Sequence, residues 1–155
     1  FNLYDYIEAV ITSLKHEFKE NHYKVSLECD KSLEIFSIPG VFSQVFTNLI
    51  MNSIIHGFKE KNYGKINIEI QKEDNILYIK YSDNGVGISE DNLDKIYDPF
   101  FTTNREEGGS GLGLSIIYNL ITVKLNGKIY CKSEKSKGVT FKIKVNLSNS
   151  KDSKK

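Results

Sequence analysis

The spacing of hydrophobic residues switches along this chain between the period of a helix and the period of a strand. Apolar residues recur every three or four positions, as on the buried side of an amphipathic helix, in the segments 2–21, 39–56 and 112–125. Strand patterns occur in the segments 24–29, 66–70, 76–81, 128–133 and 139–147, where apolar residues alternate with polar ones, except that 76–81 is apolar on both parities, as in a more deeply buried strand. The second and third of these strands are joined by a short polar turn, which predicts an antiparallel hairpin. A segment without any periodicity, 97–111, precedes the last helix.

This order of elements predicts an α+β two-layer sandwich, with a mixed, mostly antiparallel five-stranded sheet and three main helices on one face. A further short helix is expected at 90–96, capped by Ser89. With 155 residues and no internal repeat, the chain is expected to form one domain over 1–147, followed by a frayed polar tail at 148–155.

Charge and composition exclude several classes of function. The 21 basic and 20 acidic residues leave a net charge of +1, so no overall field would attract nucleic acid or an anionic membrane. No apolar stretch approaches the roughly 20 residues that cross a bilayer. Two cysteines, Cys29 and Cys131, lie far apart without neighbouring metal-ligand spacing, which favours buried free thiols. We therefore expect a cytoplasmic domain, with no nucleic-acid partner and no direct membrane contact.

Polar residues run along one side of the second helix at intervals of four. They are Gln44, Asn48, Asn52 and His56. Four residues advance about 400° around a helix, so these side chains form one slowly drifting stripe. Two carboxamides on an otherwise apolar helix need partners if they are buried. A polar ligand or a hydrated cation would supply them, and so would the neighbouring backbone.

The segment SDNGVG follows a buried strand and contains Asp83, Gly85 and Gly87. Asn-Gly is a strong hairpin signal, but a helix and not a second strand follows it. The alternative is a crossing loop that leaves the Asp83 carboxylate available to accept a hydrogen bond from an exocyclic amine. The two glycines would let a ligand approach the backbone closely.

A glycine-rich segment, GGSGLGLS at 108–115, leads from the irregular loop into the last helix. Backbone N–H groups at a helix N-terminus are suited to phosphate, although a plain linker has the same composition. Neither the P-loop pattern nor the dinucleotide-binding pattern fits this segment. Arg105, the only arginine of the chain, lies just before it and either contacts phosphate or is a solvated loop residue.

Taken together and in this order, these segments resemble the ATP-binding catalytic domain of sensor histidine kinases, within the GHKL group. The resemblance covers nearly the whole chain. The matching motifs are NLIMNSIIHGF (48–58) for the N box, DNGVGI (83–88) for the first glycine box, DPFFTT (98–103) for the F box and GGSGLGLS (108–115) for the second glycine box. The closing GVTF (138–141) is similar to the GTxF ending of the family. Val139 follows the glycine, and Thr140 precedes Phe141.

The resemblance implies the Bergerat fold and a site for ATP and Mg²⁺. Asp83 would bond the adenine amino group, Asn52 would hold Mg²⁺, and Asn48 and Arg105 would act on the triphosphate. Residues 100–109 would form a lid over the nucleotide. The ATP-binding set implied is Asn48, Asn52, His56, Asp83, Gly85, Gly87, Ile88, Phe100, Thr102, Thr103, Gly109, Ser110, Gly111, Leu112, Gly113, Leu114 and Thr140. His56 could stack on adenine, contact phosphate or merely end its helix.

The resemblance also separates a kinase from a hydrolase. The ATPases of this group have a glutamate as base one turn before the Mg²⁺ asparagine, where this chain has Asn48, which cannot take a proton. The γ-phosphate would instead pass to a histidine on a separate dimerisation domain of the same parent protein, and then to a response regulator. His16 and His22 lie in no motif for such an acceptor. A non-catalytic nucleotide-sensing module and a GHKL-type ATPase remain as alternatives.

Overall fold

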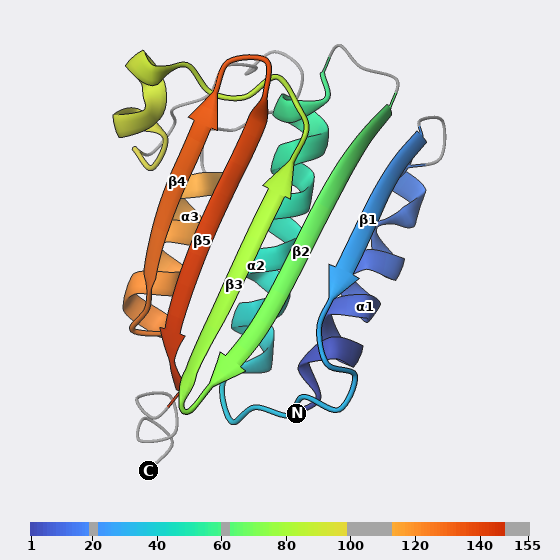
Figure 1. The fold of residues 1–155 in the computed structure, drawn as a ribbon, viewed down its shortest axis with the longest axis vertical. Coiled ribbons are helices and arrows are strands. Elements are labelled where there is room, and N and C mark those ends of the chain that lie inside the picture. Colours follow the sequence, from blue (N-terminus) through green and yellow to red (C-terminus); the bar gives the residue numbers. More distant parts are fainter. Residues whose placement is uncertain (19–21, 60–62, 99–112, 148–155) are drawn as a thin grey trace.

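The computed structural model describes residues 1–18, 22–59, 63–98 and 113–147. Its five strands form one sheet in the order β1-β2-β3-β5-β4, shown in Figure 1. The strands are β1 (His22–Glu28), β2 (Tyr63–Glu73), β3 (Ile76–Asp83), β4 (Lys128–Glu134) and β5 (Gly138–Asn146). The β1–β2 pair is parallel, and the β2–β3, β3–β5 and β4–β5 pairs are antiparallel. The predicted mixed, mostly antiparallel sheet is therefore confirmed.

Three helices cover one face of this sheet, as predicted (Figure 1). They are α1 (Leu3–Ser13), α2 (Pro39–Asn52) and α3 (Gly113–Asn119). Alternate strand residues point into the layer between sheet and helices, where they meet the apolar sides of the helices. Large side chains of this core that are at most 1% exposed include Phe42, Phe46, Leu49, Ile68, Tyr81 and Phe141. Within the described ranges, no helix combines the length and apolar character that a membrane span requires.

The helices differ from the predicted boundaries at their ends. The first helix was predicted to reach residue 21, but α1 ends at Ser13 and a 3-10 turn, η1 (Lys15–Phe18), follows. The N–H of Leu14 is shared between the carbonyls of Val10 and Ile11, which tightens the last turn. Residues 19–21 lie outside the described part of the chain.

Two helices end in a wider turn that periodicity did not predict. α2 continues into a π-helical turn, η2 (Ser53–Gly57), in which the N–H of Phe58 bonds the carbonyl of Ser53 at 2.8 Å. α3 likewise continues into η5 (Leu120–Lys124). π-helical turns are rare and frequently occur at functional sites. The predicted short helix is the 3-10 helix η3 (Glu90–Lys95). Ser89 lies at its N-cap position, as predicted, but its side chain makes no cap hydrogen bond.

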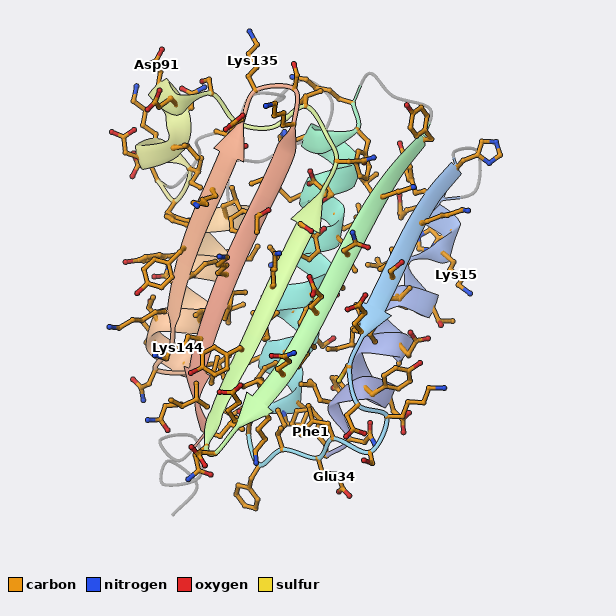
Figure 2. All side chains as sticks on the ribbon, in the orientation of Figure 1. Phe1, Lys15, Glu34, Asp91, Lys135 and Lys144 are labelled. Carbon is orange, nitrogen blue, oxygen red and sulfur yellow. The ribbon has the colours of Figure 1, made fainter. Side chains whose placement is uncertain are left out.

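Those predicted site segments that the structure describes gather at one end of the sandwich. The C-terminal ends of α2 and β3, the start of α3 and the β4–β5 turn all lie at the upper end of Figure 1. Figure 2 shows Asp91 of η3 and Lys135 of the β4–β5 turn at this end, whereas Phe1 and Glu34 lie at the opposite end. Residues far apart in sequence therefore meet where β3 ends.

Candidate functional site

Asp83, the last residue of β3, is a buried carboxylate held from three directions. Its side chain is on the helix-facing side of the sheet and the residue is 8% exposed. Oδ2 accepts a hydrogen bond from Ser53 Oγ at 2.7 Å. Oδ1 accepts from the backbone N–H of Gly85 at 3.0 Å and from that of Val139 at 3.3 Å. A buried charge is tolerated when it is hydrogen-bonded in this way.

Behind Asp83, two buried hydroxyl groups continue the network. Ser53 Oγ lies 2.6 Å from Tyr81 Oη, and Tyr81 Oη also donates to the Leu49 carbonyl at 3.0 Å. Ser53 is 1% exposed and Tyr81 is fully buried. Burial raises the pKa of Tyr81 well above its usual value, and the Asp83 charge adds to the rise. The phenol therefore stays protonated and able to donate.

Ser53 and Tyr81 were not among the predicted site residues. Ser53 was interpreted as part of the apolar side of the second helix, and Tyr81 as part of a buried strand. The sequence did indicate that Tyr81 could lie beside Asp83, because residues two apart in a strand lie on the same face of the sheet. A serine on an otherwise apolar helix side is the second signal, because a buried hydroxyl requires a partner.

The loop after Asp83 is bonded on both sides. The N–H of Val86 bonds the Gly57 carbonyl at 2.9 Å, which ties the loop to the end of η2. On the other side, the N–H of Ser136 bonds the Val86 carbonyl at 2.6 Å, and the N–H of Ile88 bonds Ser133 Oγ at 2.7 Å. The loop thus joins α2 to the β4–β5 hairpin.

Two glycines of this loop are required by close contact. A Cβ at Gly85 would lie 2.5 Å from the Gly57 carbonyl oxygen. Gly87 has a φ of 76°, and a Cβ there would collide with the carbonyl of Glu134. In this structure the glycines therefore allow close packing of the loop on its neighbours, in addition to any approach by a ligand.

Asn48 and Asn52 are half-buried on α2, one turn apart. Amide oxygens are hard, neutral ligands that suit Mg²⁺ when phosphate and water complete its coordination. This donor chemistry fits a cation that arrives with a nucleotide. Across the described residues, His, Cys, Asp and Glu side chains form no group of three or more that could hold a metal ion.

His56 follows these asparagines in η2 and is also half-buried. Burial lowers the pKa of His56 below its ordinary value of 6.5, and the charge of Lys59 lowers it further. The ring is therefore neutral at pH 7, which is compatible with stacking or hydrogen bonding and disfavours a role as a fixed positive charge.

Thr140, which the resemblance placed in the ATP-binding set, lies on the face of β5 opposite to that of Asp83 on β3. Along β5 the buried residues are Val139, Phe141, Ile143 and Val145, whereas Thr140 shares the opposite face with Lys142. Because successive strand residues point to opposite faces, Thr140 points away from the helices and from Asp83. The residue of β5 that reaches Asp83 is Val139, through its backbone N–H.

Gly113 and Leu114 begin α3, which packs against α2. A Cβ at Gly113 would meet no atom within 4 Å. The remaining predicted site residues lie outside the described residues: Phe100, Thr102, Thr103, Arg105, Gly109, Ser110, Gly111 and Leu112.

Comparison with protein families and curated proteins identifies similar sequences. Residues 37–149 match the family described as histidine kinase-, DNA gyrase B-, and HSP90-like ATPase. The chain is 37% identical over 145 residues to the signal transduction histidine-protein kinase ArlS of Staphylococcus aureus, covering 89% of this chain and 31% of ArlS. It is 36% identical over 129 residues to the autoinducer 2 sensor kinase/phosphatase LuxQ of Vibrio harveyi, covering 75% of this chain and 14% of LuxQ. The chain therefore spans less than a third of the length of these relatives.

Solved structures with the same fold include the catalytic domain of histidine kinase ThkA in a nucleotide-free form. It superposes with a TM-score of 0.81 at 26% identity and covers 95% of this chain and 93% of that domain. ThkA in complex with the response regulator protein TrrA superposes with a TM-score of 0.76 at 27% identity, covering 95% of this chain and 41% of that ThkA chain. The predicted α+β sandwich is thus the fold of histidine kinase catalytic domains.

Proposed function

This chain belongs to the family of histidine kinase-, DNA gyrase B-, and HSP90-like ATPases, and on that premise we propose that it binds Mg-ATP and donates the γ-phosphate to a histidine on a separate domain. The observation that carries the proposal is the buried Asp83 carboxylate, held at the same end of the sandwich as the half-buried Asn48 and Asn52. The parent protein would be a sensor histidine kinase of a two-component system. ATP and Mg²⁺ would be the cofactors of this domain.

Asp83 recognises adenine in this proposal. Each carboxylate oxygen can accept more than one hydrogen bond, and in this proposal Asp83 accepts one from a ligand in addition to those from Ser53, Gly85 and Val139. An exocyclic amine is a donor of the right kind, and the fixed carboxylate needs no reorganisation to accept from it. Gly85, Gly87 and Ile88 belong to the loop beside it and would contact the same base.

Asn52 and Asn48 act on the phosphates. The Asn52 amide oxygen would hold Mg²⁺, which when bound neutralises charge on the phosphate oxygens. Asn48 would position the triphosphate. Gly113 and Leu114 would contribute at the start of α3, together with Gly109, Ser110, Gly111 and Leu112. Phe100, Thr102, Thr103 and Arg105 complete the proposed nucleotide site, with Arg105 on the transferred phosphoryl group.

Transfer to another domain, and not to water, is supported by the residues at hand. Asn48 carries no group that could remove a proton from water. His16 is exposed and contacts Glu17 at 2.9 Å, and His22 is exposed at the start of β1. In this proposal the acceptor is a histidine of a dimerisation domain in the same parent protein. A response regulator would take the phosphoryl group next, and ThkA, a structural neighbour, has been solved with one.

The test is phosphotransfer from γ-labelled ATP to the dimerisation domain of the parent protein, supplied as a separate polypeptide. We expect acid-labile label on that domain only when this chain and Mg²⁺ are present. Asn52→Ala should abolish most of the label, whereas Asn67→Ala, at an exposed position of β2, should not change it. Label on this chain alone, or rapid ATP hydrolysis without an acceptor, would contradict the proposal. ATP binding without transfer would instead favour a nucleotide-sensing module.

A further inference from the structure

We propose that Ser53 and Tyr81 form a hydroxyl relay that positions Asp83 and thereby sets the preference of the site for a purine with an amino group at carbon 6. This inference rests on the proposed function, because it concerns the base that Asp83 would recognise. Both residues are positioning residues, since each acts on the ligand through the Asp83 carboxylate. The relay runs from β3 through η2 and back to the end of β3.

The direction of the relay follows from the number of hydrogens. Ser53 has one hydroxyl hydrogen, and a carboxylate can only accept, so Ser53 donates to Asp83 Oδ2 at 2.7 Å. The 2.6 Å contact between the two hydroxyl oxygens then requires Tyr81 as donor to Ser53. The Leu49 carbonyl, 3.0 Å away, shares the same phenolic hydrogen. Both hydroxyl hydrogens of the relay therefore have acceptors inside the protein: Asp83 Oδ2 for Ser53, and Ser53 Oγ with the Leu49 carbonyl for Tyr81.

Burial makes this arrangement rigid. Tyr81, Leu49 and Ser53 are at most 1% exposed, so water does not compete for these bonds. The phenol ring is fixed by its place in β3, where it packs beside Phe141 with ring centroids 6.4 Å apart. Consecutive hydrogen bonds polarise and strengthen one another, so the bond from Tyr81 to Ser53 strengthens the bond from Ser53 to the Asp83 carboxylate. The carboxylate is thus held on Oδ2 by the Ser53 hydroxyl and on Oδ1 by the backbone N–H groups of Gly85 and Val139.

The consequence is that the site can accept a hydrogen bond at Asp83 but cannot donate one there. A purine with an amino group at carbon 6, as in adenine, donates to Asp83. A purine with a carbonyl there, as in hypoxanthine or guanine, places an acceptor against an acceptor. A fixed carboxylate cannot turn away from that contact, so the relay increases discrimination between the two bases as well as affinity for the first.

The test compares ATP with ITP, which carries the carbonyl, by calorimetry on the whole chain with Mg²⁺. For Ser53→Ala we expect about a tenfold fall in the ratio of ATP to ITP affinity, the effect of losing one hydrogen bond to a charged group. Tyr81→Phe keeps the ring and should lower the ratio by a smaller factor. Ser26→Ala and Tyr130→Phe, at exposed positions of the open sheet face, are the matched controls and should leave the ratio unchanged.

The outcomes separate the relay from the proposed function. If Ser53→Ala weakens ATP and ITP equally, the hydroxyl has only a structural role and the relay is overturned. If the unaltered chain prefers ATP and both variants keep that preference, the proposed function stands and the relay falls. If the unaltered chain binds neither nucleotide, both fall. Thermal unfolding of each variant verifies that the measured ratio belongs to folded protein.

Discussion

Replacing Gly87 with alanine should loosen the loop after β3 and lower the stability of the whole domain. Gly87 has a φ of 76°, a left-handed conformation that disfavours any side chain. The added Cβ would also collide with the backbone carbonyl of Glu134, which cannot rotate out of the way as a flexible side chain could. The loop must therefore move away from the β4–β5 turn.

The magnitude follows from what that movement breaks. The left-handed conformation costs alanine about 1–2 kcal/mol. The N–H of Ile88 and the carbonyl of Val86 would lose their bonds to Ser133 and Ser136, at about 1 kcal/mol each. We expect the free energy of unfolding to fall by about 3–4 kcal/mol, a large part of the total for a domain of this size.

Urea denaturation followed by circular dichroism measures this change, with Gly40→Ala as the control. Gly40 lies in the first turn of α2, where a Cβ would meet nothing within 4 Å. Alanine there should leave stability unchanged or raise it by up to about 1 kcal/mol. If Gly87→Ala unfolds at the same urea concentration as Gly40→Ala, the loop is not held as the hydrogen bonds indicate, and the reasoning fails.

Three further predictions follow from other residues. Asn52→Ala should weaken binding of Mg-ATP by about tenfold but leave adenosine unaffected, as measured by calorimetry, because only the first ligand brings the cation; equal losses would mean a structural role. Because the pKa of His56 is lowered in the folded chain, the neutral ring contributes to stability above pH 6.5, and this contribution is lost as the pH falls through the lowered pKa. His56→Gln should therefore flatten the dependence of the free energy of unfolding on pH below pH 6.5, as measured by denaturation at several pH values. Burial raises the pKa of Cys29 to about 11 and that of Cys131 to about 12. At pH 8, Cys29 should therefore react with iodoacetamide about a hundredfold more slowly than a free cysteine, and Cys131 about a thousandfold more slowly, because the thiolate is the reactive form; rapid labelling of the folded chain would contradict this.

The periodicity of hydrophobic residues was sufficient to predict the helices and strands and their order, because each of these elements buries one side. It failed where hydrogen-bond geometry changes without a change in hydrophobicity. The π-helical turn at Ser53–Gly57 contains the same residue types as the helix before it, so no pattern marks the point where the turn widens. The end of α1 at Ser13 is similar, since Leu14 and Phe18 continue the apolar spacing.

The candidate site was predictable in part. Asp83 stood out because a carboxylate ended a buried strand, and the structure adds that three donors hold it. The sequence did not predict that Ser53 and Tyr81 lie behind it, because that contact joins two elements 28 residues apart. Thr140 was assigned to the site from a motif alone, and one step of strand alternation puts it on the other face.

The position of β1 at the end of the sheet has a consequence for how the domain opens. β1 pairs with β2 alone, and that parallel ladder joins residues 22–28 to residues 63–69 across the intervening α2. The three antiparallel ladders lie wholly between residues 63 and 146 and include the strand that carries Asp83. Cooperative units of unfolding commonly follow such divisions. We expect amide hydrogens of β1 to exchange through a partial opening that leaves β3 and β5 protected, so the α1–β1 portion could detach and reattach while Asp83 keeps its hydrogen bonds.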